Sequence, residues 1–500
     1  MLLLSKRGAW IFVGLFLVFY GVLLWFFLRP DSVRGWRECD TQTIALHLAE
    51  AHSSILRPRI DWGGVGAGYV EAEFQLYTWL VAALLRPFGD VPWAGQLVSL
   101  ASTLGAGIFV FLMLAREHRA VAAALGVVAF FSSRAVVVSA TSVQPEALCL
   151  LLYSAALYGF LRYEALTGTP ARLALLGFAL AGALAMLVKP TAAQLGISTF
   201  LLLFLRSRER LKTIEPWLAW AVILILLGLH LAHAQRLYAE SGNTFGVLSG
   251  GDSKLPRLSH LLTPGLYVQV VIQATLWGAG PAGVLALIAC LVLRRNTALL
   301  LALVAGNAVW TLLALRYTSS SAGTLYHILG AVLAAHAVAT LGDVLVPYNR
   351  VLAPALLGLV LSVWLAKSAS YRFHLLTAPW DEPSIVAGDT LRRFAKPRDI
   401  VVVRSVEPGY DAYWNTPNNF QDPRVFYRSN TRGFPLPLDD LDPKSISTSA
   451  AQGARFYIET IPPQPSPALT HYLSTNAHLL ATTPFGGRIF QLNPPTPLPR

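Results

Sequence analysis

The sequence predicts a polytopic α-helical membrane protein that ends in a small α/β domain. Of its 500 residues, 54% are hydrophobic and only 13% are charged, whereas about a quarter of the residues are charged in a typical soluble domain. Apolar runs long enough to cross about 30 Å of hydrocarbon recur from residue 8 to residue 367. Beyond residue 367 the sequence becomes rich in proline and charge. These observations exclude a single soluble globular domain.

The first apolar run, residues 8–28, follows Lys6 and Arg7. It has no small-residue cleavage site, so we expect an uncleaved anchor whose N-terminus is cytoplasmic. Ten further spans are predicted at residues 92–114, 121–140, 147–161, 173–188, 191–205, 217–234, 281–293, 297–315, 325–341 and 351–366. About eleven spans in all, an odd number, place everything after residue 367 outside the membrane.

Basic residues gather beside the ends of these spans, so the net charge of +12 and the pI of about 9.7 indicate topology rather than nucleic-acid binding. The predicted cytoplasmic loops contain Lys6, Arg7, Arg116, Arg119, Arg162, Arg172, Arg206, Arg208, Arg210, Lys212, Arg294, Arg295 and Arg350. The apolar segment 74–88 would invert this pattern if it crossed the membrane, and we therefore predict an interfacial helix there. The first outer loop, residues 29–91, is rich in arginine, whereas the positive-inside rule expects basic residues in cytoplasmic loops. This departure suggests that the arginines have a function within the loop.

The C-terminal region has the pattern of a small α/β domain. Short β-type runs occur at residues 400–403, 455–458 and 488–492, and helix-like stretches occur at residues 384–395 and 468–477. Residues 493–500 are rich in proline and are predicted to form a loose tail. We therefore predict a membrane module over residues 1–367 and a periplasmic α/β domain over residues 368–500.

The first outer loop holds the densest group of ionisable residues. Arg37, Glu38 and Asp40 lead into residues 41–55, whose spacing is that of an amphipathic helix on the membrane surface. Asp40 would lie at the N-terminus of this helix, where a carboxylate caps free N–H groups. Asp40 is thus either a helix cap or a catalytic carboxylate.

Asp61 begins a stretch with four glycines in six residues that continues to Glu71 and Glu73. Such a stretch forms either a flexible turn or a lid that closes on substrate. No Gly-Lys-Ser follows and no strand precedes it, so it is not a nucleotide-binding loop. Group transfer outside the membrane would therefore use a donor that is delivered in the lipid, not a nucleotide.

Three ionisable residues fall where predicted spans meet the outer face: Glu146, Lys189 and Arg316. The two cations are suited to binding a phosphate, although each residue could equally be a side chain that reaches from a helix end to the interface. His327 opens the next span near the same face, and a lone histidine is more often structural. No spacing of histidine or cysteine marks a metal site, so the metal ligands, if any, are not identified.

Several segments together resemble the GT-C superfamily of polytopic glycosyltransferases, in particular glycosyltransferase family 39 and the aminoarabinose-transferase-like group. The segments are Trp36-Arg37-Glu38-Cys39-Asp40-Thr41, Pro58-Arg59-Ile60-Asp61-Trp62, Gly68-Tyr69-Val70-Glu71-Ala72-Glu73-Phe74, residues 84–89, Glu146 at the start of the fourth span, and Lys189-Pro190 at the end of the fifth. The likeness covers residues 36 to about 190, and beyond that it is one of topology.

The resemblance implies an enzyme of the bacterial inner membrane that transfers a sugar from a polyprenyl-phosphate carrier to a lipid, polysaccharide or protein acceptor at the periplasmic face. It implies that Asp40 is the essential acidic residue, with Glu38 as the alternative, and that Lys189 contacts the carrier phosphate. The predicted substrate-binding set is Arg37, Asp61, Glu71, Glu73, Glu146, Lys189, Arg316 and His327. Glu73-Phe74-Gln75 replaces the Lys-Pro-Pro-like stretch of the aminoarabinose transferases, which argues against aminoarabinose transfer to lipid A.

Physical chemistry agrees with this function. A phosphate leaving group needs stabilisation of charge, which Arg and Lys supply with or without a divalent cation. The acceptor hydroxyl needs a base, and Asp40 would be that base or would hold the activating metal. A transporter or lipid flippase is one alternative, but transporters place charge near the membrane midplane. An O-antigen ligase or polymerase is the other, and such enzymes would have their main outer loop late in the chain.

Overall fold

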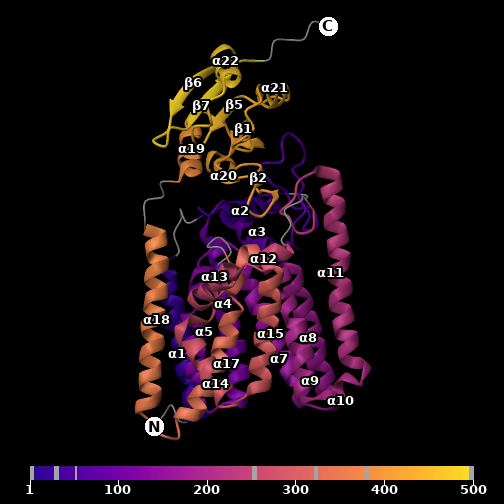
Figure 1. Cartoon of the computed structure of the whole chain (residues 1–500), viewed down its shortest axis with the longest axis vertical. Helices are drawn as coiled ribbons and strands as arrows, with labels where there is room; N and C mark the ends of the chain where they lie inside the picture. Colours follow the sequence, from indigo (N-terminus) through magenta and orange to yellow (C-terminus); the bar gives the residue numbers. More distant parts are fainter. Residues whose placement is uncertain are drawn as a thin grey trace. The chain divides into compact units, whose positions relative to one another are not determined.

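The computed structural model describes residues 5–27, 33–50, 53–249, 256–319, 325–377 and 382–494 (Figure 1). The chain forms two compact units. The membrane unit comprises Met1–Ser32, Pro92–His230 and Lys254–Thr377, and the α/β unit comprises Val33–Val91, Leu231–Ser253 and Ala378–Arg500. The first loop therefore groups with the C-terminal region, although some 300 residues separate them in sequence.

The membrane unit is built of helices. They are α1 (Lys6–Trp25), α4 (Trp93–Glu117), α5 (Ala120–Ser132), α6 (Arg134–Ser139), α7 (Glu146–Ala165), α8 (Gly168–Val188), η2 (Pro190–Ala193), α9 (Gln194–Arg206), α10 (Arg208–Leu211), α11 (Ile214–Ser241), which continues into the α/β unit, α12 (Leu258–Leu261), α13 (Pro264–Gln273), η3 (Ala274–Ala279), α14 (Gly280–Val292), α15 (Thr297–Leu313), α16 (Leu315–Thr318), α17 (Gly330–Leu345) and α18 (Leu352–Thr377). Within the described residues, six helical segments are long and apolar enough to cross a membrane: α1, α4, α8, α11, Pro264–Val292 and α18. Shorter apolar helices accompany them. The chain is thus a multi-pass membrane protein, and its number of spans, predicted as eleven, stays a prediction.

Small residues allow the helices of the membrane unit to pack closely. A Cβ atom on Gly159 of α7 would lie 3.0 Å from the carbonyl oxygen of Ala174 on α8, and one on Gly126 of α5 would lie 2.7 Å from that of Ala335 on α17. In lipid, where burial of apolar surface does not drive helix association, such close backbone approach supplies the packing. Figure 1 shows α7 and α8 side by side along their length.

Three examples show how helix boundaries differ from those predicted. The span predicted at 121–140 is broken into α5 and α6, because Ser133 is extended (φ −57°, ψ 129°) and its hydroxyl donates to the Trp277 carbonyl at 2.7 Å. The span predicted from residue 281 is preceded by helix from Pro264 onward. Helix α18 continues to Thr377, past the boundary predicted at 367–368, because the buried Ser368 and Arg372 donate hydrogen bonds to the Ser132 carbonyl and the Thr141 hydroxyl.

The α/β unit contains a five-stranded sheet of order β4-β1-β5-β7-β6. Strand β1 pairs in parallel with β4 and β5, whereas β7 pairs antiparallel with β5 and β6. The elements are α2 (Trp36–Ala49), α3 (Leu76–Phe88), α19 (Pro383–Leu391), β1 (Ile400–Arg404), β2 (Tyr410–Asp411), β3 (Thr416–Pro417), α20 (Arg424–Ser429), β4 (Arg432–Leu436), α21 (Pro443–Ala451), β5 (Phe456–Glu459), α22 (Pro467–Asn476), β6 (Ala477–Thr482) and β7 (Arg488–Leu492). The small α/β region is confirmed. Strands β2, β3, β4 and β6 and helices α20 and α21 were not predicted. Of the predicted tail, residues 495–500 lie outside the described residues.

The first loop and the sheet share one hydrophobic core. Ile44 and Trp62 from the loop pack in the same cluster as Val401, Phe426 and Ile458 from the C-terminal region. The glycine-rich stretch adds a backbone pair: the N–H of Gly64 donates to the Gly433 carbonyl and the N–H of Gly433 donates to the Asp61 carbonyl, both at 2.8 Å. The glycines thus bring the loop close to the chain's own strand β4.

Helix α2 differs from the predicted surface helix at residues 41–55. It begins at Trp36 and ends at Ala49, and Asp40 is not its cap. Gly35 is the N-cap residue, and the carboxylate of Glu38 in the first turn accepts from its N–H at 3.0 Å. The polar face is buried inside the unit instead of facing solvent, as the burial of Asp40 and His47 shows.

One prediction concerns the glycine-rich stretch. Gly68 has a φ of +70°, and a Cβ there would lie 2.3 Å from the Ile60 carbonyl oxygen, whereas a Cβ on Gly66 would meet nothing nearer than 4.0 Å. Replacing Gly68 with Ala should therefore destabilise the protein by about 1–3 kcal/mol, measured by thermal unfolding in detergent. The matched control, Gly66→Ala, should unfold as the wild type does; equal unfolding of both variants would contradict the packing of this stretch.

Candidate functional site

Asp40 is a buried carboxyl group in the second turn of α2. Its side chain accepts a hydrogen bond from the indole N–H of Trp62 at 2.9 Å, and the residue is 3% exposed. Burial raises the pKa of Asp40 to about 8, against the opposing influence of the Trp62 hydrogen bond and of Arg37. At neutral pH, below this pKa, the carboxyl group is mostly protonated, and its minor ionised fraction can accept a proton.

Arg37 and Glu73 form an ion pair beside Asp40. The Nη2 atom of Arg37 lies 2.8 and 2.7 Å from the two carboxylate oxygens of Glu73, and the guanidinium also lies 5.1 Å from the ring centroid of Phe245. Arg37 favours the charged form of Asp40 and so partly opposes the effect of burial on the pKa of that carboxyl group.

Asp61 and Glu71 each organise the loop around them. The Oδ1 atom of Asp61 lies 2.9 Å from Nε2 of His47 and 3.5 Å from Arg398. Glu71 is fully buried; its carboxylate accepts from the Thr244 hydroxyl and, at 3.0 Å, from the N–H of Leu248. Both carboxylates therefore have partners within the chain, and Glu71 fixes the segment that follows α11.

The C-terminal region adds charge close to Asp40. Asp422 is 1% exposed, accepts from the Ser384 hydroxyl at 2.6 Å and pairs with Arg424 at 2.8 Å. Burial raises the pKa of Asp422 to about 6, and its charge in turn raises the pKa of Asp40. Burial also raises the pKa of the neighbouring Cys39 thiol, so this thiol is not a reactive thiolate.

A second group of ionisable residues lies in the membrane unit. The Nζ atom of Lys189, between α8 and η2, lies 3.0 Å from Oε1 of Glu146 at the start of α7, and both side chains are largely buried. The other oxygen of Glu146, Oε2, is buried and has no hydrogen-bond partner among the described residues. Unpaired charge in an apolar environment is costly, so each residue requires the other.

Three side chains hold the non-helical segment that leads into Glu146. Arg372 of α18 is buried, and its guanidinium donates to the hydroxyl and the carbonyl of Thr141 at 2.8 and 2.9 Å. Gln96 donates to the same carbonyl at 3.0 Å, and Ser99 donates to the Ser142 carbonyl at 2.7 Å. The break between α6 and α7 is therefore a fixed support for the Glu146–Lys189 pair.

Arg316 and His327 lie around α16. The Arg316 guanidinium lies 5.8 Å from the ring centroid of Tyr317, which stacks on Tyr326 at 5.5 Å. His327 is buried, and its Nε2 bonds the Thr318 carbonyl at 2.9 Å. This bond gives His327 a structural partner. Whether it binds substrate, as predicted, is untested.

The predicted residues thus fall into separate groups. Arg37, Glu38, Asp40, Asp61, Glu71 and Glu73 lie in the α/β unit, and Glu146, Lys189, Arg316 and His327 lie in the membrane unit. The structure pairs Arg37 with Glu73 and Glu146 with Lys189. Their roles toward a substrate stay predictions.

Sequence reasoning missed three partners of these groups: Trp62, Asp422 and Arg372. Only Arg372 could have been identified from the sequence, because an isolated arginine in a long apolar helix indicates a buried partner. Trp62 stood within a segment already identified, but its indole partner could not be known, and nothing near Asp422 in the sequence connects it to Asp40.

Among the described residues, the carboxylates of the α/β unit do not bring three ligand atoms close enough together to hold one ion. Asp40, Glu38 and Asp422 each use an oxygen for a hydrogen bond within the chain. Within the described residues, the one group of three or more histidine, cysteine or acidic side chains with ligand atoms close enough to hold an ion lies elsewhere, at Glu117, His118 and His336. We therefore derive no step of chemistry at Asp40 through a metal.

Comparison with known proteins supports a glycosyltransferase fold. Residues 75–233 match the sequence model of the family described as dolichyl-phosphate-mannose-protein mannosyltransferase. The chain resembles the crystal structure of ArnT from Cupriavidus metallidurans in the apo state, with a TM-score of 0.60 and 15% identity over 97% of this chain and 98% of that one. The same protein bound to undecaprenyl phosphate gives a TM-score of 0.53 at 13% identity, with the same coverage.

The oligosaccharyltransferase of Archaeoglobus fulgidus, in complex with Zn and sulfate, is also similar, with a TM-score of 0.55 and 12% identity over 95% of this chain and 73% of that one. No curated protein sequence matches the chain. The resemblance to the GT-C superfamily is confirmed, and the chain has the GT-C glycosyltransferase fold.

The Glu146–Lys189 pair yields a prediction of stability. Lys189→Met leaves a buried carboxylate without its cation and should cost about 3–5 kcal/mol, whereas the double variant Lys189→Met/Glu146→Gln should recover most of this loss. Unfolding in detergent with increasing dodecyl sulfate measures both variants. Additive effects of the two substitutions would show that the residues do not interact.

The raised pKa of Asp40 predicts how stability depends on pH. Since the group binds its proton more tightly when folded than when unfolded, its contribution to stability is complete below about pH 4 and is lost as the pH rises towards about 8. Asp40→Asn stays neutral, so this loss, at most about 1.4 kcal/mol per pH unit, should be absent. If the free energy of unfolding depended on pH in the same way for the wild type and the variant between pH 5 and pH 8, this prediction would be contradicted.

Proposed function

We propose that the protein transfers a sugar from a polyprenyl-phosphate donor to a hydroxyl group of a lipid, glycan or protein acceptor. ArnT, which shares its fold, has been crystallised with undecaprenyl phosphate, and the archaeal oligosaccharyltransferase AglB, with a TM-score of 0.50, has been solved with a dolichol phosphate and an inhibitory peptide. The carriers in both cases are long-chain isoprenoid phosphates, which reach their enzyme through the bilayer. A multi-pass membrane protein is suited to such a donor.

The buried Asp40, with its pKa near 8, carries the proposal. A general base works best when its pKa is close to the working pH, because it then combines enough of the ionised form with enough basicity. An ordinary exposed aspartate is ionised at neutral pH but is a weak base. Burial in the core shared by the first loop and the C-terminal region raises the pKa of Asp40 and so makes it a stronger base than an exposed aspartate.

In the proposed reaction, Asp40 accepts the proton of the acceptor hydroxyl as its oxygen attacks the anomeric carbon. The bond from that carbon to the phosphate oxygen breaks, and its electron pair leaves with the polyprenyl phosphate. Negative charge grows on the phosphate during this step, and a fixed cation lowers the barrier. The resemblance to the GT-C superfamily assigns contact with the carrier phosphate to Lys189 of the membrane unit, which Glu146 holds at 3.0 Å. A single displacement inverts the anomeric centre.

We infer from the distribution of basic residues that the reaction takes place at the periplasmic face of a bacterial inner membrane. The clusters at Arg116 and Arg119 and at residues 206–212 mark the cytoplasmic ends of the helices. Lys189 and Glu146 lie at the opposite ends of α8 and α7 from Arg162 and Arg172. In this orientation, the α/β unit is periplasmic.

The experiment measures transfer of radiolabelled sugar from a panel of polyprenyl-phosphate sugars in membranes that contain the chain. The wild type should transfer one of them at a rate that rises with pH towards a midpoint near 8, the pKa of Asp40. Asp40→Asn should reduce transfer by about 100-fold or more, since the amide keeps the Trp62 hydrogen bond but cannot take up a proton.

The matched control is Glu240→Gln, which removes an exposed carboxylate of the same unit that pairs with Arg57 at 3.2 Å. It should transfer sugar at the wild-type rate. A fully active Asp40→Asn would refute the base assignment. Absence of transfer from every donor, with native lipids and polysaccharides as acceptors, would instead favour a transporter or flippase, which proteoliposome transport would then test.

A further inference from the structure

A further group of titratable side chains lies in the membrane unit, and it contains neither the Glu146–Lys189 pair nor any other residue of the proposed site. Glu117 ends α4, His118 follows it, and His336 lies in the middle of α17. One ligand atom from each residue lies within 4.8 Å of those of the other two. The imidazole rings of His118 and His336 have centroids 6.3 Å apart.

His336 is the unusual member of this group. It is fully buried, and neither ring nitrogen has a hydrogen-bond partner among the described residues. Of the buried side chains described, His336 is the one in which two polar atoms lack a partner. Burying a polar group without a bond costs free energy, and in an apolar helix a less polar residue would avoid that cost.

His118 is oriented as a metal ligand is. Its side chain is 4% exposed, its Nδ1 lies 2.9 Å from a carboxylate oxygen of Asp343, and its Nε2 is buried without a partner among the described residues. The other oxygen of Asp343 accepts from the N–H of Arg119 at 3.0 Å. A carboxylate that holds one ring nitrogen fixes the tautomer in which the opposite nitrogen is free to bind a metal.

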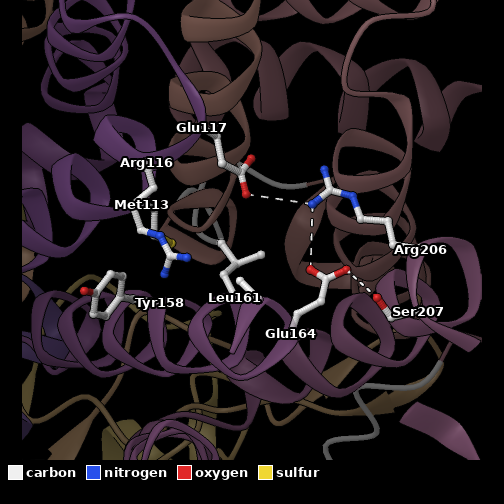
Figure 2. A pocket seen from close by; sticks show the side chains of 9 residues that line it. Met113, Arg116, Glu117, Tyr158, Leu161, Glu164, Arg206 and Ser207 are labelled. Atoms are coloured by element: carbon white, nitrogen blue, oxygen red, sulfur yellow. Dashed lines mark hydrogen bonds and ion pairs between the residues drawn. The ribbon is translucent and has the colours of Figure 1, made fainter. Parts of the chain in front are cut away.

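Glu117 supplies the acidic ligand and an access route. Glu117 lines a pocket at the C-terminal end of α4, together with Arg116, Glu164 and Arg206 (Figure 2). Figure 2 shows Arg206 between the carboxylates of Glu117 and Glu164, 3.8 Å from an oxygen of each. Because Arg206 is shared in this way and also bonds Asn296, it does not saturate Glu117.

We propose that Glu117, His118 and His336 bind a Zn²⁺ ion that ties the end of α4 to α17. Two imidazole nitrogens and one carboxylate are a donor set that Zn²⁺ prefers. Tetrahedral ligands around zinc lie about 3.3 Å from one another, so small side-chain rotations bring the three atoms into place. This site is separate from the proposed sugar transfer and from its base, Asp40.

Its location explains what the ion would do. Asp343 already connects α17 to the turn between α4 and α5 through His118 and Arg119. His336 lies seven residues before Asp343 on α17, which places both on one face of the helix, two turns apart. The ion would form a second connection between α17 and this turn and would give one buried nitrogen of each histidine a partner.

The test uses the full-length chain, purified in detergent without a polyhistidine tag, stripped with a chelator and titrated with Zn²⁺ against a metal-binding dye. We expect one equivalent of tightly bound Zn²⁺. His336→Leu, which suits an apolar helix, and His118→Asn, which keeps a donor towards Asp343, should each weaken binding by about 100-fold or more. Asp343→Asn, which acts through His118, should weaken it about 10- to 100-fold.

The matched control is His471→Asn, which alters an exposed histidine of α22 and should leave the titration unchanged. Co²⁺ in place of Zn²⁺ should give the strong visible absorption of a tetrahedral site, and His336→Leu should abolish it. Failure of the wild type to bind Zn²⁺ would overturn the proposal. Unchanged Zn²⁺ binding in both histidine variants would overturn it as well, because the ion would then be bound elsewhere.

Discussion

Burial of the Asp40 carboxyl group in a core that two distant parts of the sequence build together is the constraint on which the site depends. Ile44 and Trp62 come from the first loop, and Val401 and Phe426 from the C-terminal region. Neither part alone encloses the carboxyl group, and water would return its pKa to that of an ordinary aspartate. The C-terminal region is thus a component of the proposed site, and the charge of Asp422 raises the pKa of Asp40.

In the membrane unit, the cost of burying charged and polar side chains is offset by pairing each of them with a partner. Lys189 with Glu146, and Arg372 with the backbone and hydroxyl of Thr141, each satisfy a polar group that the apolar bundle could not otherwise hold. Breaks in helical structure accompany these pairs, between α6 and α7 and between α8 and η2. Irregular backbone at membrane depth is tolerated where protein contacts satisfy it, and such breaks in other membrane proteins line functional sites.

Much of the fold could be predicted from the sequence, because long apolar runs, basic flanks and the short β-type runs at 400–403 and 488–492 are local signals. Candidates such as Asp40, Glu146 and Lys189 stood out because charge beside apolar segments is rare. Their partners did not, since the contact of Trp62 with Asp40, and the influence of Asp422, arise only when separated segments pack. The start of α2 at Trp36 was also missed, because the amphipathic spacing of residues 41–55 does not extend to residues 36–40.

Binding of the carrier lipid tests the central claim most directly, because it requires no knowledge of the sugar or the acceptor. Undecaprenyl phosphate and undecaprenol, which differ only in the phosphate, would each be titrated into the wild type and into Lys189→Met/Glu146→Gln and followed by native mass spectrometry. The account predicts that the wild type prefers the phosphate and that the double variant binds both lipids equally. Equal binding of both lipids by the wild type would contradict it.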